Sequence, residues 1–254
     1  MFDAKSLLDQ FLGGQNQSGP NKQGQQSLGQ QGFGNSRGGD LLQQAGNMLG
    51  GFGGGALTGG LAGLLLGSKG GRKMAGNALA YGGMAVAGAL AYRAYQNYQA
   101  GKQASPTAGA SVPLLPPPAD TPFNPTSEAD QQSLARNLLR AMISAAKADG
   151  HIDAAEQVNI FAQMDKMNVG ADDKVFVMDE LRKPLDVDSV ASAARTPEEA
   201  AELYTVSLLA IDVDNPSERG YLALLAARLN LDDKLVAHLH ATVEAATEKV
   251  KQPA

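Results

Sequence analysis

Apolar residues recur at helical spacing through the second half of the chain. Leu134, Leu138, Met142 and Ala145 fall on one face of a helix predicted over residues 127–148. Similar stripes, each preceded by a capping residue or by acids, predict further helices that begin near residue 153 and cover residues 172–182, 187–194, 196–213, 215–230 and 232–249. No segment shows the alternation of a strand. The pattern therefore predicts an all-α domain of about seven helices over residues 126–254.

The start signals of these helices differ in strength. The strongest is Thr196-Pro197-Glu198-Glu199, which combines a capping hydroxyl, a proline at the first helical position and acids in the first turn. Ser127 is the corresponding predicted cap of the first helix of the domain.

The first 40 residues contain little that could be buried. Apolar residues at near-helical spacing predict a short amphipathic helix over Met1–Leu12, stopped by Gly13 and Gly14. An unstructured N-terminus is the alternative. Residues 15–40 are rich in Gln, Gly, Asn and Ser, a composition that favours disorder.

Two long uncharged runs follow, Gly50–Gly67 and Met74–Tyr92, separated by Lys69, Arg72 and Lys73. Runs of about 18–20 uncharged residues are long enough to cross a bilayer, so residues 41–100 are predicted to be membrane-associated, as a helical hairpin or a single span. Small residues recur every four positions and predict a face for close helix packing. This face comprises Gly55, Gly59, Gly63, Gly67, Gly83 and Ala87. Because nine of the eighteen residues of the first run are Gly, a flexible linker is the alternative there.

Composition and charge divide the chain in the same way. Of the 30 glycines, 27 lie at or before Gly109, and seven prolines between Pro106 and Pro125 indicate an extended linker over residues 101–125. Residues 1–125 carry a net charge of +4 and residues 126–254 a net charge of −9. The positive half suits anionic lipid, whereas the negative half makes nucleic acid an unsuitable partner. The chain has no Cys, which excludes disulfides and thiolate chemistry.

Two helix junctions gather acidic residues. The first carries Asp149, Asp153 and Glu156, and the second carries Asp212, Asp214 and Glu218. If the two junctions pack together, their carboxylates form a candidate site for Ca²⁺ or Mg²⁺. The alternative is that these acids act singly as helix caps, without an ion.

The string Ala148-Asp149-Gly150-x-Ile152-Asp153-x-x-Glu156 resembles the signature of TerB-like domains, named for tellurite resistance. A Gly-rich N-terminal part before such a domain is similar to the YebE-like inner-membrane proteins of bacteria. The resemblance implies a bundle of roughly seven helices, a metal-binding acidic cluster and a bacterial inner-membrane location, with the helical domain in the cytoplasm.

The sequence contains no phosphate-binding loop, no HExxH motif and no supported Ser/His/Asp set. We therefore expect a non-catalytic, membrane-tethered adaptor or stress-response protein that binds membrane lipid, a protein partner and a divalent cation, and that self-associates through the glycine face. A soluble interaction protein with a disordered Gly-rich tail is one alternative. A metal-dependent hydrolase that uses the acidic cluster is the other.

Overall fold

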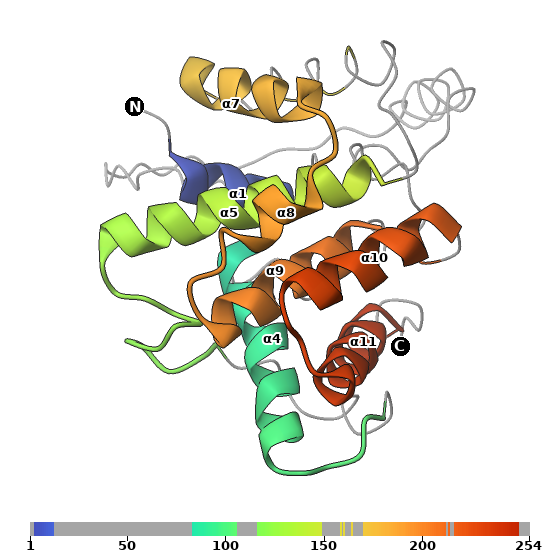
Figure 1. The fold of residues 1–254 in the computed structure, drawn as a ribbon. Helices are drawn as coiled ribbons and strands as arrows, with labels where there is room; N and C mark the ends of the chain where they lie inside the picture. Colours follow the sequence, from blue (N-terminus) through green and yellow to red (C-terminus); the bar gives the residue numbers. More distant parts are fainter. Residues whose placement is uncertain are drawn as a thin grey trace, which may run out of the picture.

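The computed structural model describes residues 3–12, 83–105, 116–148, 158, 160, 164, 170–211, 213 and 216–248. Within these residues the chain forms eight helices and no strand, which confirms the predicted all-α class (Figure 1). The helices are α1 (Ala4–Leu12), α4 (Gly83–Gln99), α5 (Glu128–Ala146), α7 (Ala171–Arg182), α8 (Val187–Ala191), α9 (Pro197–Ala210), α10 (Pro216–Arg228) and α11 (Asp233–Glu248).

Helix α9 lies at the centre of the bundle. Every residue from Glu199 to Ala210 is buried, and α4, α5, α10 and α11 pack around it (Figure 1). A helix that is apolar on nearly all sides needs such an enclosed position, and residues 203–211 contain no charged side chain.

The start of α9 has the predicted form. The Thr196 hydroxyl accepts a hydrogen bond from the Glu199 backbone N–H at 3.1 Å, and Pro197 occupies the first helical turn. The Glu199 carboxylate also accepts from the Arg195 backbone N–H at 2.8 Å and from its guanidinium at 2.9 Å. Ser127 occupies the predicted cap position of α5, but its side chain makes no capping hydrogen bond.

The short N-terminal helix predicted over Met1–Leu12 is present as α1. Ala4, Leu7 and Leu8 are fully buried in the hydrophobic core, and α1 packs against α5 and α4. Asp3 begins the helix by accepting from the Ser6 backbone N–H at 3.0 Å. Its carboxylate also accepts from the Gln132 side chain at 2.8 Å, which ties the start of α1 to α5.

Helix α4 overlaps the second uncharged run, for which a membrane span is predicted. In the structure α4 packs against α9, α11 and α1, and Leu90, Ala91 and Ala94 are fully buried in the common core. Residues 74–82 of the run lie outside the described residues. Among the helices that the structure describes, none combines the length and the hydropathy needed to cross a bilayer.

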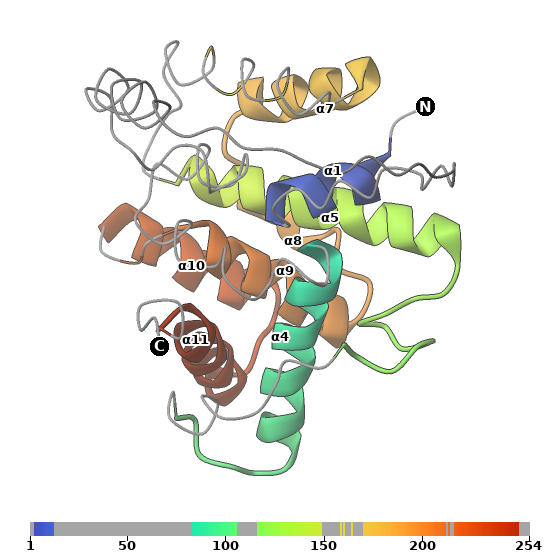
Figure 2. The ribbon, with the colours of Figure 1, turned by 180° about the vertical axis from the view of Figure 1, so that it is seen from behind.

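The end of α1 meets the start of α4. An Asp9 carboxylate oxygen accepts from the Met84 backbone N–H at 3.3 Å, in the first turn of α4. Figure 2 shows α1 above the start of α4 on this side of the bundle. The last turns of α1 and the first turn of α4 therefore lie together at one corner of the bundle.

The last part of the Pro-rich segment is packed rather than detached. The Phe123 ring is buried and meets Tyr92 and Tyr95 of α4 edge-on, at centroid distances of 5.5 and 5.7 Å. A tight turn orders the segment, with Asp120 at a φ of 63° and its N–H donating to the Asn124 carbonyl at 3.0 Å. The hydrophobic core thus includes α1, α4 and Phe123, all from before residue 126.

Helix α7 is fixed to α5 through a buried carboxylate. Glu180 is 6% exposed and accepts from the Arg140 guanidinium at 3.1 Å and from the Lys183 ammonium at 2.7 Å. Burial acts to raise the pKa of Glu180, but the hydrogen bonds from Lys183 and Arg140 outweigh it and hold the pKa below its usual value. The Lys147 ammonium, at the end of α5, donates to the Glu180 carbonyl at 3.1 Å and so caps the end of α7.

Candidate functional site

Most of the predicted acidic cluster lies in chain that the structure leaves undescribed. Asp149, Asp153, Glu156, Asp212 and Asp214 fall outside the described residues. Glu218 lies in the first turn of α10 and is partly buried. No three His, Asp or Glu side chains within the described residues approach closely enough to hold a metal ion.

The predicted small-residue face is placed only in part. Gly55, Gly59, Gly63 and Gly67 lie outside the described residues. Gly83 begins α4, and Ala87 is fully buried in the core of this bundle. Here the small residues of α4 allow close contact with helices of the same chain.

Two other segments approach α4 closely at Gly88. A Cβ atom at this position would lie 2.7 Å from the Phe123 carbonyl oxygen and 2.9 Å from a Glu202 carboxylate oxygen. It would also lie 3.6 Å from Cγ of Pro117. Gly88 is therefore the point at which α4, α9 and the Pro-rich turn meet.

Glu202 is a carboxylic acid inside the core. It is 0% exposed, and neither carboxylate oxygen has a hydrogen-bond partner in the part of the chain that the structure describes. Burial raises the pKa of Glu202 well above its usual 4.5, and the charge of Glu199 on the same helix raises it further. The neutral form of the Glu202 side chain is therefore favoured where α9 meets α4.

A second buried polar contact joins α9 to α11. The Tyr204 hydroxyl lies 2.9 Å from Nε2 of His240. Burial raises the pKa of Tyr204 to about 12 and lowers the pKa of His240. Both side chains are therefore neutral at pH 7, and the contact is a hydrogen bond between uncharged groups.

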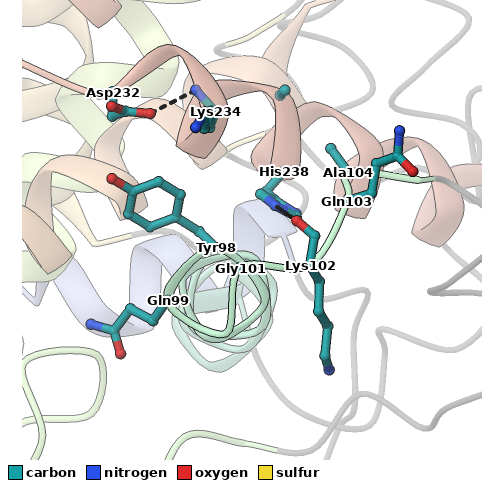
Figure 3. Close-up of a pocket in the computed structure, with 10 residues that line it drawn as sticks. Tyr98, Gln99, Gly101, Lys102, Gln103, Ala104, Asp232, Lys234 and His238 are labelled. Carbon is teal, nitrogen blue, oxygen red and sulfur yellow. Dashed lines mark hydrogen bonds between the residues drawn. The ribbon is translucent and has the colours of Figure 1, made fainter.

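An open groove of about 710 Å³ lies where the end of α4 approaches the start of α11 (Figure 3). Gly101 ends α4 with a φ of 62°, a left-handed conformation that favours glycine. It turns the chain so that Lys102 runs along α11. The Lys102 carbonyl lies 3.0 Å from Nε2 of His238, and the Tyr98 ring meets the imidazole edge-on at 6.5 Å.

The groove is suited to binding rather than to proton transfer. A carbonyl only accepts hydrogen bonds, so Nε2 of His238 carries the hydrogen and is committed to the backbone of Lys102. The Lys102 side chain extends away from the ring (Figure 3) and donates to Asn97 at 3.2 Å. Asp232 accepts from the Lys234 backbone N–H at 2.8 Å and so begins α11. The remaining surface offers both charges, amide groups and an aromatic ring, a mixture typical of a polar protein contact.

These features define an all-helical bundle protein with a neutral buried acid on its central helix and a polar groove at one end. The chain belongs to the family described as "Protein of unknown function (DUF533)", whose model matches residues 51–243. The match begins in the Gly-rich run and extends into α11, so the family unit spans the change of composition near residue 126.

A curated relative is similar over part of the chain. It is an "Uncharacterized protein in ampR 5'region" of Yersinia enterocolitica, 35% identical over 96 residues, which are 38% of this chain and 69% of the relative. No solved structure matches.

Neither Glu202 nor Gly88 was predicted from the sequence. The signal for Glu202 was present, because it lies in a helix whose later residues are apolar on all sides. An acid in such a helix is buried with it. Gly88 had no comparable signal, since the close approach of Phe123 depends on a turn that lies 35 residues further along the chain.

Proposed function

We propose that this protein is a non-catalytic, membrane-tethered adaptor. In this proposal residues 13–82 attach the chain to a membrane from one side, and the helical bundle binds a protein partner on that same side. The proposal also includes the closer family relationship: the bundle is a TerB-like domain, and the protein is a YebE-like protein of the bacterial inner membrane. In this proposal the bundle lies in the cytoplasm.

The contact between Asp9 and Met84 carries this proposal. Both ends of the segment 13–82 are joined at one corner of the bundle, through α1 and α4. A segment whose two ends belong to one folded body has to enter and leave a membrane on the same face. This geometry supports a hairpin or a shallow insertion over a single span.

The composition of the segment supports lipid contact. Gly50–Gly67 has no charged residue and ends in the apolar stretch Leu64-Leu65-Leu66 before its last glycine. Lys69, Arg72 and Lys73 follow directly and would lie at the height of anionic headgroups. An apolar run with bases at one end is the arrangement of a one-sided membrane anchor.

One observation favours the soluble alternative. Helix α4 is the more apolar of the two candidate spans, and it packs inside the bundle. Only the Gly-rich run is then left for lipid, and glycine contributes little apolar surface. In this second proposal the bundle is a soluble interaction module and residues 13–82 are a flexible loop. The cation site remains a proposal from the sequence, because five of its six acids lie outside the described residues.

Flotation with lipid vesicles distinguishes the two proposals. We expect the purified full-length chain to float with vesicles of phosphatidylglycerol and phosphatidylethanolamine and to stay bound through an alkaline carbonate wash. Leu64→Asn, Leu65→Asn and Leu66→Asn together should abolish flotation, because they remove the apolar surface that enters the lipid. Leu224→Asn, at a residue that is 44% exposed on α10, is the control and should leave flotation unchanged. A wild-type chain that does not float with these vesicles would establish the soluble alternative.

A further inference from the structure

The interface between α4 and α9 contains a carboxyl group, that of Glu202, whose ionised form would destabilise the packing of the two helices. Glu202 is completely buried, and one of its oxygens faces Gly88 of α4 so closely that a Cβ atom there would lie 2.9 Å away. The backbone of Phe123 closes the same space from the Pro-rich turn. A carboxylate in this position has no hydrogen-bond donor and no compensating cation among the described residues, so ionisation is strongly disfavoured while α4 is docked.

The other charged groups around the interface leave Glu202 uncompensated. The only charged group that acts on its carboxyl, within the described residues, is Glu199, which is itself held by Arg195 at 2.9 Å. The titratable side chains on the packed helices contribute nothing comparable to the pKa of Glu202. They are Tyr92, Arg93, Tyr95 and Tyr98 on α4, Glu128, Asp130, Arg136 and Arg140 on α5, Asp188 on α8, Glu218, Arg219, Tyr221 and Arg228 on α10, and Asp233, Lys234, His238, His240 and Glu244 on α11.

Helix α4 is held on the bundle by apolar packing. Its buried face combines small residues, including Ala87, Ala91 and Ala94, with the larger Val86 and Leu90. The helix carries only one charged residue, Arg93, so apolar contacts dominate its attachment.

We propose that Glu202 is a pH-sensitive latch that holds α4 on the bundle when it is protonated and releases α4 when it ionises. When α4 is released, water reaches the Glu202 carboxyl, and the pKa of this group returns to its usual range. Docking of α4 therefore takes up one proton, and release gives it back. Because the docked state binds more protons, the docked population falls as the pH rises above the usual carboxyl range. The inference does not depend on membrane attachment, since it concerns α4 and α9 alone.

Amide hydrogen exchange tests the latch in the full-length chain. Wild type and Glu202→Gln are compared at each pH from 5 to 8, so the intrinsic pH dependence of exchange cancels in the ratio of their rates. We expect the ratio for peptides of α4 to rise with pH by as much as about tenfold per unit, because above the usual carboxyl pKa each unit multiplies the equilibrium constant for opening by ten while the docked form stays protonated. Glu202→Leu is a second uncharged variant and should give the same trend.

Peptides from residues 134–145 of α5 provide the internal control. Local release of α4 leaves these peptides protected, so at each pH α4 should exchange with a smaller opening free energy than α5, which opens only on global unfolding. A ratio for α4 that stays constant between pH 5 and 8 would overturn the latch. Equal opening free energies of α4 and α5 across this range would also overturn it, because they would show that α4 is released only when the whole bundle unfolds.

Discussion

Glu202→Gln is expected to stabilise the protein at neutral pH, against the usual effect of a core substitution. The native chain holds Glu202 as a buried acid, whereas the unfolded chain ionises it freely above its usual pKa of 4.5. The folded state then binds more protons than the unfolded state, so the free energy of unfolding falls as the pH rises. The loss is about 1.4 kcal/mol per pH unit until the raised pKa is reached.

The variant has no such loss, since a neutral amide does not titrate. The free energy of unfolding of wild type and Glu202→Gln, measured by urea denaturation from pH 4 to 8, should converge at the acidic end and separate above pH 5. Glu244→Gln, at an exposed position on α11, is the matched control and should change stability by less than about 0.5 kcal/mol at any pH. A constant difference between wild type and Glu202→Gln across this range would show that the carboxyl is solvated in the fold.

Gly88→Ala and Gly220→Ala are expected to change stability in opposite directions, although both replace a glycine inside a helix. At Gly88 the new methyl group would lie 2.7 Å from the Phe123 carbonyl, a backbone atom that cannot rotate away. Forcing this contact should cost about 1–3 kcal/mol and should separate the Pro-rich turn from α4. At Gly220 no heavy atom lies within 4 Å of the added carbon, so alanine should stabilise α10 by about 0.5–1 kcal/mol.

Thermal or urea denaturation of the two variants shows whether each substitution raises or lowers the stability of the protein. The pair is informative because the gain in helix propensity is the same at each position, and only the surroundings differ. A Gly88→Ala chain at least as stable as wild type would show that the Pro-rich turn does not rest on α4.

The helices of the second half follow closely from the sequence because their start signals are local. Thr196 and Pro197 specify the first turn of α9 through contacts with residues two or three positions away, and the structure begins the helix there. Ser127 shows the limit of this reasoning, because a residue at a cap position does not always use its side chain.

The environment of α4 could not be read in the same way. A run of Ala, Leu, Val and Met with small residues at regular spacing suits the interior of a membrane and the interior of a bundle equally well. The pattern reports that α4 is surrounded by apolar groups, and only the tertiary contacts show that α9 and α11 supply them. For the same reason, the boundary at residue 126 follows the change of composition, while the hydrophobic core continues across it.

The buried acid illustrates a different limit. The helix-start signals place acids in the first turn of α9, where they favour the helix dipole, and these signals alone do not separate Glu202 from Glu198 and Glu199. Glu202 differs from Glu198 and Glu199 because α9 enters the hydrophobic core within one turn of its start. The Glu199 carboxylate forms a salt bridge with Arg195, whereas no cation among the described residues acts on Glu202.

Helices α1 and α4 belong to one body, so the proposed membrane tether requires residues 13–82 to leave and return on a single side of the membrane. Because the chain has no Cys, single cysteines report position cleanly. Ser6→Cys on α1 and Gln99→Cys at the end of α4 replace exposed residues, and Val175→Cys, at a residue 60% exposed on α7, marks the side of the bundle. A membrane-impermeant thiol reagent is applied to spheroplasts and to inverted inner-membrane vesicles from bacteria that express each full-length variant. We expect all three variants to be labelled in the inverted vesicles and not in the spheroplasts, whereas labelling of the Ser6→Cys and Gln99→Cys variants from opposite sides of the membrane would contradict the claim.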